Sequence, residues 1–328
     1  MTLKFALLGA GRIGKVHARA ISGNRDAELA VVADASAEAA EAISQQYGCR
    51  ISTIEDIAAD ASIEGVIICT PTTTHADLIE KFARAGKAIF CEKPVDLDVV
   101  RAQACLEVVR ETGTRLMLGF QRRYDPHFLA VKKALSKGRV GEIEMIQIIS
   151  RDPGAPPMDY IRTSGGIFRD MTIHDFDMAR FLLGEEPVTV YATGSVLTDK
   201  ALAGVDFDSA SVTMTTASGK HCTISNSRRA TYGYDQRVEV HGSKGTISVE
   251  NQRPAAIELA TADGFTRPAL HDFFMTRYIE AYAAEIAAFV AVVRDGATPS
   301  PNGEDGLRAL MLADAAFRSA KEGVVVAL

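Results

Sequence analysis

The chain has 328 residues, of which 47% are hydrophobic and 24% are charged, an ordinary composition for a globular protein. Its formal net charge of -6 and its isoelectric point near 5.7 argue against a nucleic-acid-binding surface, which normally needs a basic patch. The length is sufficient for two domains. The substrates that remain are small molecules, either neutral or recognised by a few local charges.

Cysteine usage and hydropathy indicate a cytoplasmic protein. The five cysteines, an odd number with no CxxC spacing, are at 49, 69, 91, 105 and 222. Cys69 and Cys91 lie in apolar runs, where cysteine behaves as a small hydrophobic residue. No run approaches the ~18 apolar residues of a membrane helix, and the apolar N-terminal stretch is too short for a secretion signal. We therefore expect reduced thiols and no membrane segment.

Apolar runs and helical periods alternate over the first 120 residues. Strands are expected at 3–8, 29–33, 65–69, 88–91 and 115–119, and helices at 15–22, 36–47, 53–58, 76–85 and 97–112. This βαβ rhythm predicts an α/β fold whose N-terminal domain, residues 1–120, is a doubly wound Rossmann domain with a parallel sheet.

A glycine motif, G-x-G-x-x-G, follows the first strand at residues 9–14. Gly9 permits a tight turn, Gly11 lets the backbone approach a pyrophosphate, and Gly14 lets the helix pack close to the strand. Asp34, at the end of the second strand, can accept hydrogen bonds from ribose hydroxyls and would repel a 2′-phosphate, which favours NAD over NADP. A plain glycine turn, and Asp34 as a helix N-cap, are the alternatives.

Two further strand ends carry candidate residues. Thr70-Pro71-Thr72 could face the cofactor, together with His75 at the start of the next helix, although N-capping alone would explain this pattern. Glu92-Lys93-Pro94 fixes a lysine beyond the C-terminal end of a strand, the edge at which open α/β sheets bind ligands. The expected cofactor contacts are Gly9, Gly11, Arg12, Ile13, Gly14, Asp34, Thr70, Pro71, Thr72, His75, Glu92 and Lys93.

The pattern changes after residue 120. A helix is expected at 120–137, followed by strands at 144–151, 188–197, 209–216, 221–228, 236–241 and 246–250, and by helices at 273–293 and 303–321. Consecutive strands with few helices between them predict an α+β domain, residues 121–328, with a large open, mostly antiparallel sheet. One face of that sheet should pack on helices, which leaves the other for a homo-oligomer.

The segment 165–177 carries Asp170, His174 and Asp177 at spacings i, i+4 and i+7. On a helix, these three side chains share one face. A carboxylate beside an imidazole fixes its tautomer and raises its basicity, which suits a general base that removes an alcohol proton. A simply solvated helix face is the main alternative. A zinc site is disfavoured because the cluster has one histidine, so no metal is expected.

These motifs together resemble the Gfo/Idh/MocA oxidoreductases, which are NAD(P)-dependent sugar and polyol dehydrogenases. The resemblance rests on residues 9–14, 70–72 and 92–94 and on the Asp170…His174 pattern, and it covers essentially the whole chain. It implies that His174 is the catalytic base, that Lys93 assists it, and that Asp170 is the carboxylate that orients it.

Two segments are similar to the branch of that family that oxidises inositols, namely G-F-x-R-R-Y-D at residues 119–125 and Y-G-Y-D at residues 232–235. The resemblance implies that Arg122 and Tyr234 bind substrate hydroxyls. A salt bridge from Arg122 to Asp125, or sheet packing of Tyr234, would be the alternative. Asp152 departs from an Asn-like polyol contact of that branch, and Ser150 replaces a histidine, so the exact polyol stays open. The expected substrate contacts are Lys93, Arg122, Asp152, Asp170, His174 and Tyr234.

The expected activity is therefore NAD-dependent oxidation of a cyclic polyol, with myo-inositol and its 2-ketone as the leading pair. Another inositol isomer or an aldose is the alternative substrate. A non-catalytic NAD-sensing regulatory protein is an alternative of another class, disfavoured because a sensor needs neither Lys93 nor His174. A homo-oligomer, either dimer or tetramer, is expected, with no nucleic acid or membrane as a partner.

Overall fold

The computed structural model describes residues 2–328 and divides into two compact units. The first comprises Met1–Asp125 and Ile279–Leu310, and the second comprises Pro126–Tyr278 and Met311–Leu328. The domain boundary expected at residue 120 lies close to Asp125, where the chain first passes from the first unit to the second. The return of Ile279–Leu310 to the first unit was not predicted.

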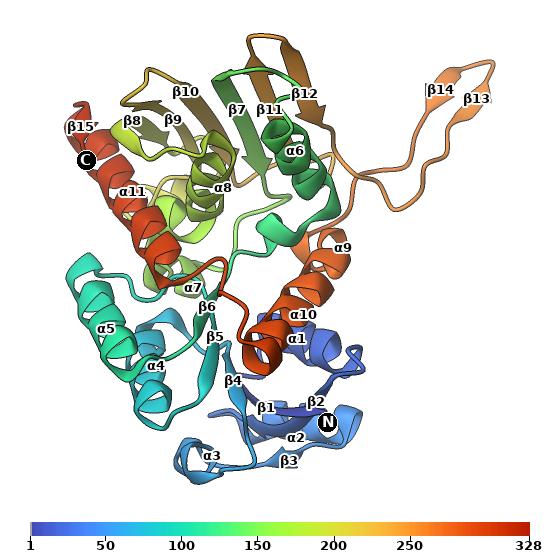
Figure 1. Ribbon diagram of the computed structural model, residues 1–328. Coiled ribbons are helices and arrows are strands. Elements are labelled where there is room, and N and C mark those ends of the chain that lie inside the picture. Colours follow the sequence, from blue (N-terminus) through green and yellow to red (C-terminus); the bar gives the residue numbers. More distant parts are fainter. Residues whose placement is uncertain (1) are drawn as a thin grey trace. The chain divides into compact units, whose positions relative to one another are not determined.

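The first unit is built on a six-stranded parallel sheet with strand order β3-β2-β1-β4-β5-β6 (Figure 1). The order reverses between β1 and β4, which makes the C-terminal ends of these strands the expected ligand edge. The doubly wound fold is confirmed. The strands are β1 (Leu3–Leu8), β2 (Ala27–Ala33), β3 (Arg50–Ile51), β4 (Gly65–Ile68), β5 (Ala88–Glu92) and β6 (Leu116–Gly119).

Helices cover both faces of this sheet. On one face α4 contacts α5, and on the other α1 contacts α2 and α10 (Figure 1). The helices are α1 (Arg12–Ser22), α2 (Ala37–Tyr47), α3 (Ile54–Ala59), α4 (His75–Arg84), α5 (Val99–Thr112) and α10 (Ile279–Asp295), with the 3-10 turns η1 (Thr72–Thr74) and η2 (Gln121–Tyr124). The ring of Phe289 in α10 lies 5.5 Å from that of Phe5 and 5.8 Å from that of Phe90, so α10 completes the core.

The second unit contains a seven-stranded sheet with order β12-β11-β7-β10-β9-β8-β15. Only β7 and β10 pair in parallel among these neighbours, so the mostly antiparallel sheet is confirmed. The strands are β7 (Ile143–Arg151), β8 (Pro187–Ser195), β9 (Ser209–Thr216), β10 (His221–Ser227), β11 (Asp235–Gly242), β12 (Gly245–Val249) and β15 (Val326–Ala327).

One face of this sheet is buried and the other is exposed. Helices α6 (Pro126–Ser136) and α8 (Ile173–Leu183) contact the buried face, as does the end of α11 (Gly303–Glu322), whose Ser319 hydroxyl accepts a hydrogen bond from the Ala192 amide. On the other face, Met145 and Tyr191 keep 49% and 42% of their surface exposed. Alternating burial along each strand follows from the two-residue period of a β-strand.

Three features of the second half differ from the sequence prediction. The helix expected at 120–137 is interrupted, because Pro126 disfavours helical geometry at Asp125, which is extended between η2 and α6. The helix expected at 273–293 is divided into α9 (Phe274–Arg277) and α10. A hairpin of β13 (Leu259–Thr261) and β14 (Gly264–Thr266) was not predicted and extends away from the rest of its unit (Figure 1).

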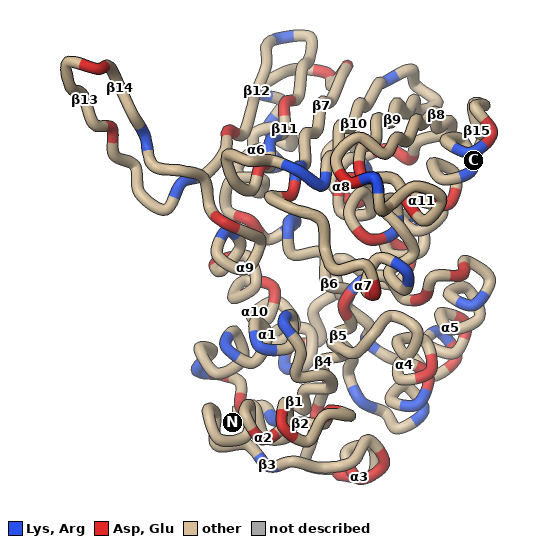
Figure 2. The backbone as a smooth tube through the Cα atoms, turned by 180° about the vertical axis from the view of Figure 1, so that it is seen from behind, with Lys and Arg blue, Asp and Glu red and all other residues tan. Residues whose placement is uncertain are grey.

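Positions of Lys and Arg are interspersed with positions of Asp and Glu along the backbone (Figure 2). Over residues 2–328, no long segment of the backbone consists mainly of Lys and Arg, which agrees with the net charge of -6. Across residues 2–328, no helix has the length and apolarity needed to cross a bilayer.

Asp208 is a buried carboxylate that organises the connection between β8 and β9. It accepts hydrogen bonds from the backbone amides of Leu197, Thr198 and Asp199 at 2.7–3.0 Å and from the Ser209 hydroxyl at 2.9 Å. Burial alone would raise the pKa of Asp208, but these donors outweigh it and lower the pKa to about 2. The ionised carboxylate is therefore the form that stabilises the fold.

We expect Asp208→Asn to lower the free energy of unfolding by about 2 kcal/mol at pH 7, measured by urea denaturation. Because the folded-state pKa lies below the ordinary value of 3.8, the stabilisation is complete above about pH 4 and is lost as the pH falls toward 2. The difference between wild type and variant should therefore shrink over that interval. The exposed Asp263→Asn is the matched control, with a change of under ~0.5 kcal/mol.

Candidate active site

The glycine loop after β1 has the geometry that its three glycines predict. Gly9 has a φ of +95°, and a Cβ there would lie 2.6 Å from the Cys69 carbonyl carbon. A Cβ on Gly14 would lie 2.0 Å from the Gly9 carbonyl oxygen. A Cβ on Gly11 would meet no described heavy atom within 4 Å, so the space beside this residue is open to a ligand. Each glycine is thus required for its own reason.

The start of α1 can bind an anion. The helix begins at Arg12 with Gly11 as its N-cap, and glycine offers no side chain to cap the first amides. Those amides and the positive end of the helix dipole are the usual partners of a dinucleotide pyrophosphate. The exposed Arg12 and half-buried Ile13 lie in this first turn. The loop therefore fits the phosphates of a dinucleotide.

Asp34 follows β2 beside the glycine loop. Its Oδ2 accepts a hydrogen bond from the Ala10 amide at 2.6 Å, and its Oδ1 accepts one from the Ser36 amide at 2.7 Å. The N-cap of α2 is Ser36, so the capping alternative for Asp34 is not what the structure contains. Each carboxylate oxygen keeps a second lone pair, which leaves Asp34 able to accept hydrogen bonds from ribose hydroxyls.

His75 joins two loops at the sheet edge. Its Nδ1 lies 2.7 Å from the Pro94 carbonyl oxygen and its Nε2 lies 2.8 Å from the Thr70 carbonyl oxygen. The side chain is buried, and burial lowers the pKa of His75 against the opposing effect of these two carbonyls. Both ring nitrogens face the protein, so His75 holds the Thr70 loop against the Lys93-Pro94 turn, whereas Pro71 and Thr72 lie on the loop's outer side.

Glu92, the last residue of β5, is turned toward α1. Its Oε1 lies 2.7 Å from Nε2 of His17, whose side chain is fully buried. A Cβ on Gly119 would lie 2.9 Å from the Glu92 carboxylate carbon, so β6 approaches closely at this point. His17 was missed by sequence reasoning. The available signal was its position three residues after Gly14, on the buried face of α1 with Ala18 and Ile21.

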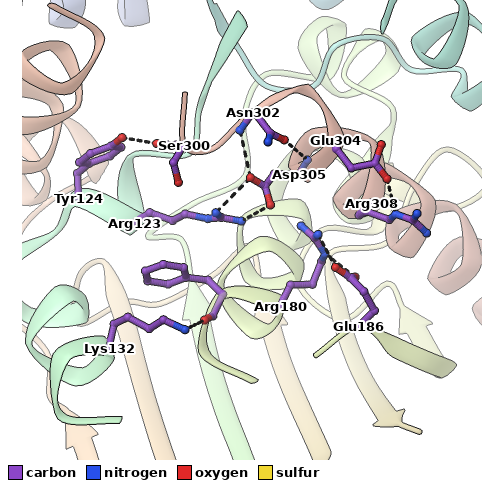
Figure 3. Close-up of polar contacts among 11 residues, drawn as sticks. Arg123, Tyr124, Lys132, Arg180, Glu186, Ser300, Asn302, Glu304, Asp305 and Arg308 are labelled. Carbon is purple, nitrogen blue, oxygen red and sulfur yellow. Dashed lines mark hydrogen bonds and ion pairs between the residues drawn. The ribbon is translucent and has the colours of Figure 1, made fainter. Parts of the chain in front are cut away.

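The two arginines of η2 have different surroundings. Arg123 donates from Nη2 to Asp305 Oδ1 at 2.9 Å, and Asp305 forms a reciprocal pair of hydrogen bonds with Asn302 at the start of α11 (Figure 3). Tyr124 donates to the Ser300 carbonyl oxygen in the same view. Arg123 therefore stabilises a helix start. Arg122 is buried, with 4% of its surface exposed, and stays the candidate for substrate binding.

Within the second unit, Asp170 and His174 lie where a π-helical turn passes into an α-helix. The turn η3 (Phe168–Thr172) is π-helical, and α8 begins at Ile173. The prediction that Asp170 and His174 lie on one regular α-helix is therefore wrong, because the wider π-helical turn contains Asp170. Turns of this type are frequent at functional sites. His174 is half-buried, whereas only 1% of the Asp177 surface is exposed.

Asp170 is held by residues that the sequence did not single out. Its Oδ1 accepts a hydrogen bond from the Tyr160 hydroxyl at 2.9 Å. Its Oδ2 lies 3.4 Å from Nη1 of Arg228, which also contacts Asp206. Tyr160 comes from α7 (Met158–Thr163) and Arg228 follows β10, so the fold brings together three distant segments.

A buried polar network anchors α8 next to His174. Asp175 accepts hydrogen bonds from the Ser150 hydroxyl at 2.6 Å and from the Asn226 side-chain amide at 2.7 Å, and Asn226 accepts one from Thr172 at 2.8 Å. These bonds link α8 to β7 and β10. Ser150, which replaces a histidine of the inositol-oxidising branch, thus has a structural role in this chain as a partner of Asp175.

The remaining candidates of the second unit lie at strand ends. Tyr234 has 6% of its surface exposed. The centre of its ring lies 5.8 Å from that of Phe273 and 6.0 Å from that of Tyr278, so this side chain has the packing role that was the alternative to substrate binding. Asp152 is half-buried and donates its backbone amide to the Ser227 carbonyl oxygen at 2.9 Å. Within residues 2–328, no group of three or more His, Cys, Asp or Glu side chains is arranged to hold a metal ion.

Family models match both parts of the chain. Residues 3–120 match the model described as the oxidoreductase family, NAD-binding Rossmann fold, and residues 132–328 match the C-terminal alpha/beta domain of the same family. The chain belongs to the Gfo/Idh/MocA family of oxidoreductases. Its N-terminal domain is accordingly an NAD-binding domain, in agreement with the glycine loop and with Asp34.

Individual relatives of this oxidoreductase are close. An inositol 2-dehydrogenase of Rhizobium meliloti (strain 1021) is 68% identical over 323 residues, 98% of each chain. The solved myo-inositol dehydrogenase of Corynebacterium glutamicum is 44% identical, with a TM-score of 0.96 over 100% of this chain and 99% of that one. The solved scyllo-inositol dehydrogenase of Lactobacillus casei with bound NAD(H) and scyllo-inositol is 27% identical, with a TM-score of 0.94 over the same shares.

Replacing two glycines of the NAD loop separately should divide folding from binding. We expect Gly14→Ala to lower the free energy of unfolding by about 2 kcal/mol or more, because its Cβ would overlap the Gly9 carbonyl. Gly11→Ala should fold with near-normal stability but bind NAD ~10-fold or more weakly, because its Cβ would enter the space for the pyrophosphate. Thermal unfolding and NAD titration measure the two effects; equal behaviour of the variants would contradict the assignment.

Proposed function

We propose that this oxidoreductase oxidises myo-inositol to its 2-ketone with NAD+. The observation that carries the proposal is the 68% identity, over 98% of both chains, to a protein named inositol 2-dehydrogenase. Every residue on which the proposed chemistry depends is present, namely Lys93, Asp170 and His174. A second candidate, scyllo-inositol, is supported by the relative that was solved with NAD(H) and that isomer.

In the proposed mechanism His174 removes the proton from the reacting hydroxyl. Asp170, four residues before His174, is proposed to orient the imidazole and to stabilise the imidazolium that forms. Lys93, as a cation, stabilises the alkoxide oxygen as it develops. NAD, when bound, supplies the hydride acceptor. Lys93 belongs to the first unit and His174 to the second. The proposed mechanism requires both side chains to reach the oxygen of the reacting hydroxyl.

Other residues are proposed to hold the substrate and the cofactor. Arg122 and Tyr234 bind ring hydroxyls, and Asp152 is the residue at which this chain departs from its branch, with a carboxylate acceptor for a hydroxyl. The glycine loop and Asp34 bind the dinucleotide directly. His75 and Glu92 act through their protein partners, because they hold the loops that carry Thr70 and Lys93.

We also propose a cytoplasmic homo-oligomer, a dimer or a tetramer. All five cysteines are free and buried, as expected for a reducing compartment. The exposed face of the second sheet presents Met145 and Tyr191, and the hairpin β13–β14 presents Phe265 with 76% of its surface exposed. Apolar side chains in such positions fit a contact with a second copy of the chain.

His174→Ala should reduce turnover at least ~10²–10⁴-fold, the usual contribution of a general base, while NAD binding stays unchanged. Steady-state kinetics and NAD titration measure the two quantities. The matched control is His221→Ala, which removes an exposed histidine from β10 and should leave turnover unchanged. Near-normal turnover of the His174 variant would remove this residue from the mechanism.

An NADH absorbance assay over inositol isomers and hexoses tests the substrate. We expect myo-inositol to give the highest kcat/KM, with NAD clearly preferred to NADP because the Asp34 carboxylate would repel a 2′-phosphate. A preference for scyllo-inositol would select the second candidate. NADH production with none of these compounds would contradict the enzymatic proposal itself.

A further inference from the structure

A buried cation lies beside Asp170. Arg228 directly follows β10, and 1% of its surface is exposed, although it is one of the largest side chains of the chain. Its backbone amide donates to the Asp208 carbonyl oxygen at 2.8 Å, which fixes the point at which the side chain enters the interior. A guanidinium remains protonated at every accessible pH, so its burial has to be compensated by carboxylates.

Two carboxylates provide this compensation. Nη1 and Nη2 of Arg228 lie 3.4 and 3.5 Å from Oδ2 of Asp170, and Nη2 lies 3.5 Å from Oδ2 of Asp206. Only 14% of the Asp170 side chain and 5% of the Asp206 side chain are exposed. One cation thus contacts two like charges in a largely buried place, where charges interact strongly.

Asp206 connects the cluster to the backbone just before the π-helical turn. Its Oδ1 accepts a hydrogen bond from the Ile167 amide at 3.1 Å. The preceding Gly166 has a φ of +82°, and a Cβ there would lie 2.7 Å from this oxygen. Arg228, through Asp206, therefore also fixes the segment from which Asp170 projects.

The remaining oxygen of Asp170 is held from another side. The Tyr160 hydroxyl donates to Oδ1 at 2.9 Å, whereas Arg228 faces Oδ2. With both oxygens held, the carboxylate is oriented before any substrate binds, which is the arrangement that favours catalysis by a preorganised site.

We propose that Arg228 is a positioning residue of the oxidation: it supplies the charge opposite to Asp170 and orients this carboxylate, so that Asp170 can hold the general base His174. This inference rests on the proposed function. It assigns a catalytic consequence to a side chain that binds neither substrate nor cofactor, and it extends the site to Asp206 and Tyr160.

The electrostatic consequence can be derived from the groups that face Asp170, which are Arg228, Asp206 and Tyr160, with His174 four residues further along the chain. Burial raises the pKa of Asp206, and the charge of Asp170 adds to this effect while Arg228 opposes it. Without the cation, two carboxylates would share the place, and one would bind a proton at a higher pH. A protonated Asp170 cannot stabilise an imidazolium, so the acid limb of kcat/KM would move to higher pH.

The experiment measures pH profiles of kcat/KM for myo-inositol with NAD. Arg228→Met should lower kcat ~10-fold or more and move the acid limb upward by about 1 pH unit or more, with NAD affinity unchanged. Arg228→Lys, which keeps the charge, should bring the limb back toward wild type. The exposed neighbour Arg229→Met is the matched control and should keep the wild-type profile.

A second variant decides the matter if Arg228→Met does not fold. Asp206→Asn keeps an oxygen for the Ile167 amide but removes one negative charge, so Arg228 then faces Asp170 alone and the acid limb should move to lower pH. A wild-type profile in Arg228→Met, or in Asp206→Asn where Arg228→Met does not fold, accompanied only by a lower melting temperature, would show a purely structural role and overturn the inference. Failure of the proposed function would look different, because wild type would then oxidise no polyol or His174→Ala would stay active.

Discussion

A charged group that is buried must find its partner inside the protein, and the candidate site is organised by this constraint. Glu92 is hydrogen-bonded to His17, Arg123 is paired with Asp305, and Arg228 is paired with Asp170 and Asp206. In each case the partners come from segments that are separated in the sequence. The pairing of charge therefore fixes how these elements meet, and it leaves the candidate catalytic side chains at defined positions.

In the first unit, two buried histidines connect the loops at the C-terminal edge of the sheet. His17 joins the helix after the glycine loop to the end of β5, and His75 joins the Thr70 loop to the Lys93-Pro94 turn. The dinucleotide loop and the candidate lysine are thus linked through buried hydrogen bonds. A change at either histidine should be felt both in NAD binding and at Lys93.

Much of the architecture could be predicted from local sequence patterns. The glycine spacing, the apolar strands and the acid at residue 34 specify the Rossmann domain because each depends on neighbouring residues. The partners of Asp170 could not be predicted in this way, since Arg228 lies 58 residues away from it along the chain. The break in the helix expected at 120–137 does have a local cause in the sequence, because Pro126 disfavours helical geometry at Asp125.

The return of the chain to its first unit has a consequence for handling the protein. Phe289 and Ile286, from α10, belong to the same core as Phe5 and Phe90. A truncated polypeptide that stops after the Rossmann strands would expose these aromatic surfaces to water and would be prone to aggregate. The NAD-binding unit can therefore complete its fold only after nearly the whole chain has been synthesised, which makes residues 1–120 alone a poor choice for expression.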